Sequence, residues 1–160
     1  MRLIDNVKFV TGCNPAALAT TAGDGDYVSL KNYTNLAVVI TVLNGTTVTG
    51  GAVTLKQATD VAGTSEKALS FSKMFANTDT AASDTLTETA VTSDTFTTST
   101  TNSKALKYVI EVDAVSLDVD NGFDCVRVDV ASMANATGNV EYILYGAREK
   151  SPIAISAITD

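Results

Sequence analysis

The sequence predicts an all-β fold, a jelly-roll-like antiparallel β-sandwich of about eight strands. Three observations support this prediction. Apolar and polar residues alternate at period two in several short runs, as they do in half-buried strands. Turn-forming residues separate these runs at intervals near the roughly 8–12 residues typical of sandwiches. Thr and Val, which favour strands, are abundant, and no stretch has a persuasive amphipathic helix pattern.

The expected strands are short runs separated by turn signals, and they occupy 27–31, 36–43, 52–58, 69–75 and 140–147. The run at 36–43 is apolar on both faces, which predicts a central strand. Asn44-Gly45 follows that run as a strong turn signal. A loop is expected at 20–26, because two glycines lie there among small polar residues.

The segment 76–103 is dominated by Thr, Ser, Asp and Asn. It is either a disordered low-complexity segment or a set of exposed strands and turns. We favour strands and turns, because Leu86, Val91 and Phe96 recur as apolar anchors and Thr suits a solvated sheet face.

Residues 106–130 carry the clearest strand pattern in the chain. Leu106, Tyr108, Ile110 and Val112 fall on one face of a first run. Val126, Val128 and Val130 share a face of a second run, opposite Cys125, Arg127 and Asp129. Asp-Val-Asp-Asn-Gly joins the two runs. The sequence therefore predicts a central pair of antiparallel strands connected by a turn.

A length of 160 residues suggests one domain spanning 1–160, large enough to form a core without metal or disulfide support. The first 20 residues form either a short strand and a turn or an arm lying on a partner. The tail at 148–160 contains Pro152 and the apolar Ile153, Ile155 and Ile158. It forms either a final edge strand on its own sandwich or an arm that adds to a neighbouring subunit, which makes the three isoleucines candidate interface residues.

The charge and hydropathy of the chain exclude some classes of partner. The formal net charge is −7, and a strongly acidic chain repels phosphate backbones, so no nucleic-acid partner is expected. No apolar run approaches the roughly 20 residues of a membrane helix, so no membrane partner is expected. The N-terminus lacks the apolar core of a signal peptide, which predicts synthesis in the cytoplasm.

The chain contains no His. Ser-His-Asp and Cys-His catalysis and His-based zinc sites are therefore excluded within it. Glu111 and Asp113 lie on one strand face and could serve carboxylate chemistry, but a solvated face is the better interpretation. We expect no enzyme activity, no catalytic residues and no cofactor.

Two local features remain open from the residues alone. Asp118, Asp120 and Asn121 resemble the first half of a calcium loop, yet the bidentate Glu of such loops is missing, so a plain turn is preferred to a weak cation site. Cys13 and Cys125 are predicted to be free thiols. A disulfide between them would require the N-terminal segment to lie beside the 123–130 strand.

Several longer passages resemble a family of small tailed-bacteriophage proteins encoded near the major capsid protein. The passages lie at 8–18 (KFVTGCNPAAL), 27–33 (YVSLKNY), 52–63 (AVTLKQATDVAG), 79–86 (DTAASDTL) and 108–130 (YVIEVDAVSLDVDNGFDCVRVDV). They contain no catalytic motif, so the resemblance rests on their length and their common order.

The resemblance implies a capsid decoration (cement) protein with a jelly-roll-like sandwich. Such a protein sits on the outer surface of the virion head and bridges subunits of the major capsid protein, often as a dimer or trimer. It would be made in the cytoplasm of the bacterial host. Two other functions remain open from the sequence, namely a structural component of a phage tail or fibre and, with less support because Trp is absent, a carbohydrate-binding module.

Overall fold

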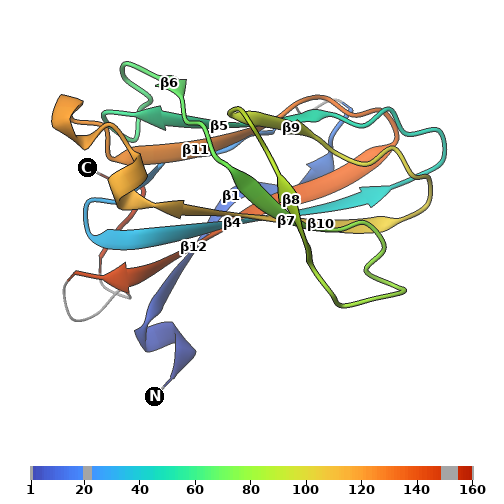
Figure 1. The fold of residues 1–160 in the computed structure, drawn as a ribbon, viewed down its shortest axis with the longest axis horizontal. Coiled ribbons are helices and arrows are strands. Elements are labelled where there is room, and N and C mark those ends of the chain that lie inside the picture. The colour runs from blue at the N-terminus through green and yellow to red at the C-terminus, as the bar shows by residue number, and fades with distance from the viewer. Residues whose placement is uncertain (1, 20–22, 149–154, 160) are drawn as a thin grey trace.

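A computed structural model describes residues 2–19, 23–148 and 155–159. Its strands form two antiparallel sheets that pack face to face, which confirms the predicted all-β sandwich (Figure 1). Sheet A contains six strands in the spatial order β1 (Val7–Ala17), β12 (Ala136–Ala147), β4 (Tyr33–Asn44), β10 (Ala105–Asp113), β7 (Lys73–Asn77) and β8 (Thr87–Ala90). Sheet B contains β2 (Gly23–Asp24), β3 (Val28–Ser29), β11 (Cys125–Val130), β5 (Ala52–Ala58), β6 (Lys67–Ala68) and β9 (Thr95–Thr97).

The order of the strands is that of a jelly roll. Four strands of sheet A make up one half of the jelly roll, in the order β1, β12, β4 and β10, and those of sheet B make up the other half, in the order β2 with β3, then β11, β5 and β9. Along the chain, β1, β4, β10 and β12 of sheet A alternate with strands of sheet B, except that β5 and β9 are neighbours in sheet B. This alternation is the double Greek-key connectivity of jelly rolls. The strands β6, β7 and β8 form an insertion between β5 and β9.

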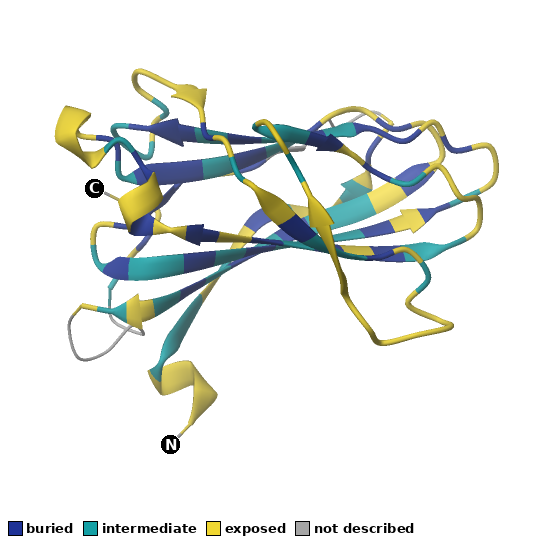
Figure 2. Cartoon of the chain, viewed as in Figure 1, coloured by how far each residue is buried: buried dark blue, intermediate teal, exposed yellow. Residues whose placement is uncertain are grey.

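The core lies between the two sheets and follows the period-two pattern of the sequence. On β4, every second side chain from Leu36 to Val42 is fully buried, and those between are half-buried. Leu106, Tyr108, Ile110 and Val112 of β10 point into the same core, as predicted. Phe96 of β9 packs on Tyr108, with ring centroids 5.1 Å apart. Figure 2 shows the buried residues on the inner faces of both sheets.

A tyrosine hydroxyl links the two sheets. Tyr142 of β12 is fully buried, and its hydroxyl accepts a hydrogen bond of 2.9 Å from the backbone N–H of Val128 in β11. The ring lies so close to Gly12 of β1 that a side chain there would overlap it. Gly12 is therefore required for the close approach of β1 to this ring.

The prediction that the two runs of 106–130 form a pair of strands is wrong. The strand β10 pairs with β4 and β7 in sheet A, whereas β11 pairs with β2, β3 and β5 in sheet B. The connection contains two short 3₁₀ helices, η2 (Ala114–Ser116) and η3 (Val119–Asn121). Leu117 and Phe123 are buried, so the connection packs onto the core as it crosses between the sheets. Such a crossing needs more chain than a two-residue hairpin turn.

Two other segments refine the sequence prediction. Residues 76–103 do form exposed strands and turns, with Phe96 buried and Val91 partly buried, but Leu86 is 39% exposed and is no anchor.

Asn44 ends β4 at the predicted turn, yet the next strand, β5, belongs to the other sheet. The buried Asn44 amide donates to the carbonyls of Ser99 and Thr101, and thereby holds a neighbouring loop.

The two ends of the chain lie differently on the sandwich. Val7–Ala17 pairs with β12 as the edge strand of sheet A, and η1 (Leu3–Asp5) extends beyond it. Near the other end, Ala157 is buried, and its carbonyl accepts a hydrogen bond of 2.8 Å from the backbone N–H of Ser29. The described part of the tail therefore contacts its own sandwich. No helix in the described ranges is long and apolar enough to cross a membrane.

Candidate functional site

The outer face of sheet A carries a continuous apolar area. In one row of the sheet, Phe9 of β1 lies opposite Ile143 of β12, which lies opposite Ala37 of β4. In the next row, Val39 of β4, Val109 of β10 and Phe75 of β7 are opposite one another. We call these six side chains the sheet A patch. Phe9 is 46% exposed and the other five are half-buried, whereas their inward neighbours are buried. Among the described residues, no second layer covers this face (Figure 1).

Carboxylates border the sheet A patch at the ends of both rows. In the first row, Glu111 of β10 lies opposite Ala37 of β4. In the second row, Glu141 of β12 lies opposite Val39 of β4. Glu141 accepts a hydrogen bond from the Thr11 hydroxyl, and Glu111 a long one of 3.4 Å from Tyr145. Neither carboxylate forms an ion pair with a lysine or arginine of the described chain.

The remaining charges on this face are partly paired. Lys73 pairs with Glu88 of β8 at 3.3 Å, and its ammonium lies 5.8 Å from the centre of the Phe75 ring. Lys107 is exposed in the row beyond Val109. Two of the carboxylates that border the patch therefore lack an ion-pair partner among the described residues, and Lys107 adds one exposed cation to the same border.

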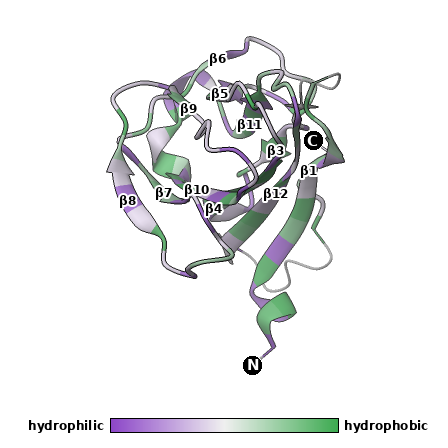
Figure 3. Ribbon diagram, turned by 90° about the vertical axis from the view of Figure 1, so that its right-hand side faces the viewer, coloured by the Kyte–Doolittle hydropathy of each residue, from purple (hydrophilic) through white to green (hydrophobic). Residues whose placement is uncertain are grey.

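Exposed apolar side chains also extend from the elements around sheet A. Leu3 and Ile4 of η1 are 68% and 44% exposed, and Leu43 at the end of β4 is 56% exposed. In Figure 1, η1 and the 78–86 loop both extend below sheet A, on the side away from sheet B. Figure 3 shows hydrophobic segments in η1 and the adjoining part of β1, with hydrophilic bands between them. Exposed apolar area of this kind marks surfaces that contact other proteins.

The outer face of sheet B has a different character. Lys56 of β5 lies 2.7 Å from Glu66 and 2.7 Å from Asp129 of β11. Arg127 of β11 pairs with the same two carboxylates, at 2.9 and 2.8 Å. The Tyr27 hydroxyl donates to Glu66 at 2.6 Å, and its ring lies 5.0 Å from the Arg127 guanidinium. We call these five residues the sheet B network.

The charges of the sheet B network satisfy one another. Hydrogen bonds from Lys56 and Tyr27 lower the pKa of Glu66, and the bonds to Asp129 and Glu66 raise the pKa of Lys56. Burial, followed by the bond to Glu66, raises the pKa of Tyr27. A face whose charges are already paired gains little from a charged partner.

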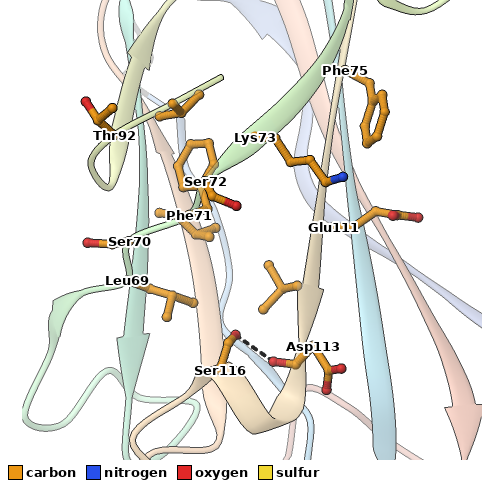
Figure 4. A pocket seen from close by; sticks show the side chains of 13 residues that line it. Leu69, Ser70, Phe71, Ser72, Lys73, Phe75, Thr92, Glu111, Asp113 and Ser116 are labelled. Carbon is orange, nitrogen blue, oxygen red and sulfur yellow. Dashed lines mark hydrogen bonds between the residues drawn. The ribbon is translucent and has the colours of Figure 1, made fainter. Parts of the chain in front are cut away.

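A groove opens beside the end of β10, where β7 no longer pairs with it (Figure 4). Its volume is about 520 Å³, within the range of small-molecule sites. Leu69, Phe71 and Val112 contribute apolar walls, and Glu111 and Asp113 lie on one side. The Asp113 carboxylate accepts from the Val115 N–H, so it caps η2. The groove offers an apolar surface with carboxylate and hydroxyl groups at its rim.

The candidate cation loop is a turn whose main carboxylate already has partners. The Lys67 ammonium pairs with Asp118, and the Asn121 amide donates to the same carboxylate at 2.8 Å. These two contacts lower the pKa of Asp118. Asp120 is exposed on η3, and Gly122 completes the turn with a φ of 83°. Within the described ranges, no group of three His, Cys, Asp or Glu side chains is placed to hold a metal ion.

The remaining sequence candidates are dispersed. Ile153 lies outside the described residues, Ile155 is half-buried and Ile158 is 51% exposed. Ile158 lies beside Phe9 of β1 in a shallow groove at the edge of sheet A. Cys13 and Cys125 are both free thiols, as predicted, and Cys125 is buried near Tyr27 and Ala58.

The sheet A patch was not predicted, although the sequence contains a signal for it. The run at 36–43 is apolar on both faces, and the prediction of a central strand is confirmed, because β4 lies between β12 and β10. Only its inward side chains are fully buried, however. A strand that is apolar on both faces in a sheet covered on one side indicates an outward-facing apolar surface.

Comparison with known proteins leaves the family of this chain open. No protein-family model matches the sequence, and no curated protein matches it either. Among solved structures, the SPBc2 prophage-derived protein YomS is similar at 17% identity, with 90% of this chain and 96% of that chain covered and a TM-score of 0.47. The structure of the CBM22-1 and GH10 modules of Clostridium thermocellum endo-1,4-beta-D-xylanase 10B is similar at 9% identity, with 91% of this chain and 27% of that chain covered and a TM-score of 0.35. Both overlaps are too loose to carry an argument about this chain.

Proposed function

We propose that this chain is a structural protein of a bacteriophage virion, which decorates the outer surface of the mature head and bridges subunits of the major capsid protein. The proposal assigns it a binding role without catalysis. The protein would be synthesised in the cytoplasm of the bacterial host and would bind the shell as a dimer or trimer.

The observation that carries the proposal is where the family-like passages fall in the fold. The passage at 8–18 contains most of β1, that at 52–63 contains all of β5, and that at 108–130 contains most of β10 and all of β11. These strands belong to both sheets. A resemblance distributed over the framework of a fold supports a shared architecture better than one confined to a loop.

The surface properties of the chain are consistent with this role. An outward-facing apolar patch favours binding to protein, and the net charge of −7 disfavours binding to packaged DNA. Many copies on a symmetric lattice multiply the effect of a modest interface, so about 800 Å² per partner suffices.

Sedimentation with phage heads tests the proposal. Heads of the encoding phage, assembled without this protein, are mixed with the purified chain and pelleted, alongside unexpanded precursor shells. We expect saturable binding to mature heads and weaker binding to precursors, because the protein would select the expanded lattice. Failure to bind mature heads would contradict the proposal. Stacked rings in the absence of heads would favour a tail or fibre component.

Carbohydrate binding is the second candidate, and the groove beside β10 is the observation that favours it. Phe71 offers a ring, and Glu111 and Ser72 offer polar groups at the rim. Titration with soluble oligosaccharides, followed by NMR, tests this function. Saturable shifts confined to these residues would support it, and their absence across the panel would reject it.

A further inference from the structure

We propose that the sheet A patch is the docking surface of this chain, and that its occupant is a partner protein whose apolar surface is bordered by lysine or arginine side chains. The sheet B network then faces solvent. This inference rests on the proposed function and names the face that contacts the shell.

The two outer faces of the sandwich differ in how far their charges are paired and in their apolar area. On sheet B, Lys56 and Arg127 each pair with two carboxylates, so a charged partner would gain little by binding to this face. On sheet A, six apolar side chains form two adjacent rows without a covering layer in the described chain. Burial of such an area releases about 25 cal/mol for each Å² of apolar surface, before the cost of association is subtracted.

The unpaired carboxylates around the patch favour one kind of occupant. Glu111 and Glu141 end the two rows and form no ion pair with a described cation. Carboxylates at the rim of an apolar surface favour basic side chains opposite them and accelerate encounter with such a partner.

The same charges argue against a second copy of this chain on the patch. A two-fold arrangement of sheet A against sheet A would place the rim that carries Glu111 and Glu141 in one copy against the same rim of the other. Each copy also carries a net charge of −7. Like charges facing each other across an interface are unfavourable, so self-association would use another surface.

Two double variants test the patch, each with a matched control. Glu111→Lys/Glu141→Lys reverses the rim charge, and its control Asp120→Lys makes the same kind of change on exposed η3. Val39→Thr/Val109→Thr replaces methyl by hydroxyl on outward side chains and retains the β-branched shape that strands favour. Its control is Val115→Thr/Val119→Thr, at positions that are 79% and 55% exposed on η2 and η3. Thermal unfolding establishes that all four variants fold.

Affinity for phage heads assembled without this protein is then measured for each folded variant. We expect each patch variant to bind at least about tenfold more weakly than wild type, a loss of about 1.4 kcal/mol, and each control to bind within about twofold. Added salt should weaken wild type and affect the Glu111→Lys/Glu141→Lys variant less.

The possible outcomes distinguish failure of the proposed docking face from failure of the proposed function. If wild type does not bind heads, the proposed function fails, and the docking face fails with it. If wild type binds and both patch variants bind equally well, the docking face is wrong while the function stands. Light scattering adds a third outcome: a wild-type dimer that Val39→Thr/Val109→Thr converts to monomer would assign the patch to a second copy and overturn the proposal.

Discussion

At the scale of single residues, the Tyr142 hydroxyl connects the two sheets. It accepts the backbone N–H of Val128 at 2.9 Å in a fully buried position. Burial raises the pKa of this phenol, so it stays neutral throughout the physiological range. A single atom of β12 thus satisfies a backbone donor of β11 across the core.

Replacement of Tyr142 by Phe tests this connection. The variant retains the ring but leaves the Val128 N–H without its partner, which should lower the free energy of unfolding by about 1–3 kcal/mol. Urea denaturation measures the change. Tyr145→Phe is the matched control, because its hydroxyl makes only a 3.4 Å bond to an exposed carboxylate. Equal stability of Tyr142→Phe and wild type would contradict the role of the hydroxyl.

Glu66 makes stability depend on pH through the sheet B network. Its pKa in the folded chain lies below its ordinary value of 4.5, because Lys56 and Tyr27 donate to its carboxylate. The stabilisation is therefore present above pH 4.5 and is lost as the pH falls through the lowered pKa. Since the side chain is 31% exposed, solvent screening limits the effect to about 0.5–1 kcal/mol.

Glu66→Gln should accordingly flatten the acid side of the stability profile. Urea denaturation between neutral and acidic pH should show the variant less stable than wild type at pH 7 and nearly equal to it once Glu66 is protonated. Glu88→Gln is the control, because Glu88 forms only an exposed pair with Lys73. If the difference in unfolding free energy between Glu66→Gln and wild type were the same at every pH, Glu66 would not be the source of the pH dependence.

At the scale of elements, the connection from β10 to β11 depends on the backbone of its turn. Gly122 has a φ of 83°, and an added methyl group would meet no atom within 4 Å. Gly122→Ala should therefore cost about 1 kcal/mol of unfolding free energy through backbone strain alone. Urea denaturation measures it, and an unchanged midpoint would mean that the turn relaxes.

The same turn is not expected to bind calcium. Asp118 is held by Lys67 and Asn121, so a cation would have to displace an existing ion pair. We expect the melting temperature to stay constant as calcium is added to millimolar concentrations. A rise that Asp118→Asn abolishes would establish a cation site.

Local patterns in the sequence predict single strands better than they predict strand neighbours. The alternation in 106–113 identified β10 and its buried face, because side-chain period depends only on the backbone. The partner of β10 could not be obtained in this way. Whether a connection turns back or crosses to the other sheet depends on packing of Leu117 and Phe123, which no local rule describes.

The same distinction applies to the candidate site. The apolar character of 36–43 was visible in the sequence, but its outward exposure depends on the packing of the whole sandwich, in which the described residues form no third layer over sheet A. The sheet B network joins residues 27, 56, 66, 127 and 129, which only the assembled sheet brings together.

At the scale of the whole molecule, the sandwich has two unlike outer surfaces. One carries paired charges, and the other carries the apolar patch with Glu111 and Glu141 at its rim. A protein that lies between solvent and a shell needs such an asymmetry, because one face must stay hydrated while the other is buried. The jelly roll supplies both faces on a rigid framework.

Cryo-electron microscopy of phage heads assembled without this protein, after addition of the purified chain, tests whether the protein decorates the shell. We expect a density of the size of the sandwich at repeated lattice positions, where it spans neighbouring capsid subunits. Heads that show no added density at any lattice position, at saturating concentrations of folded protein, would contradict it.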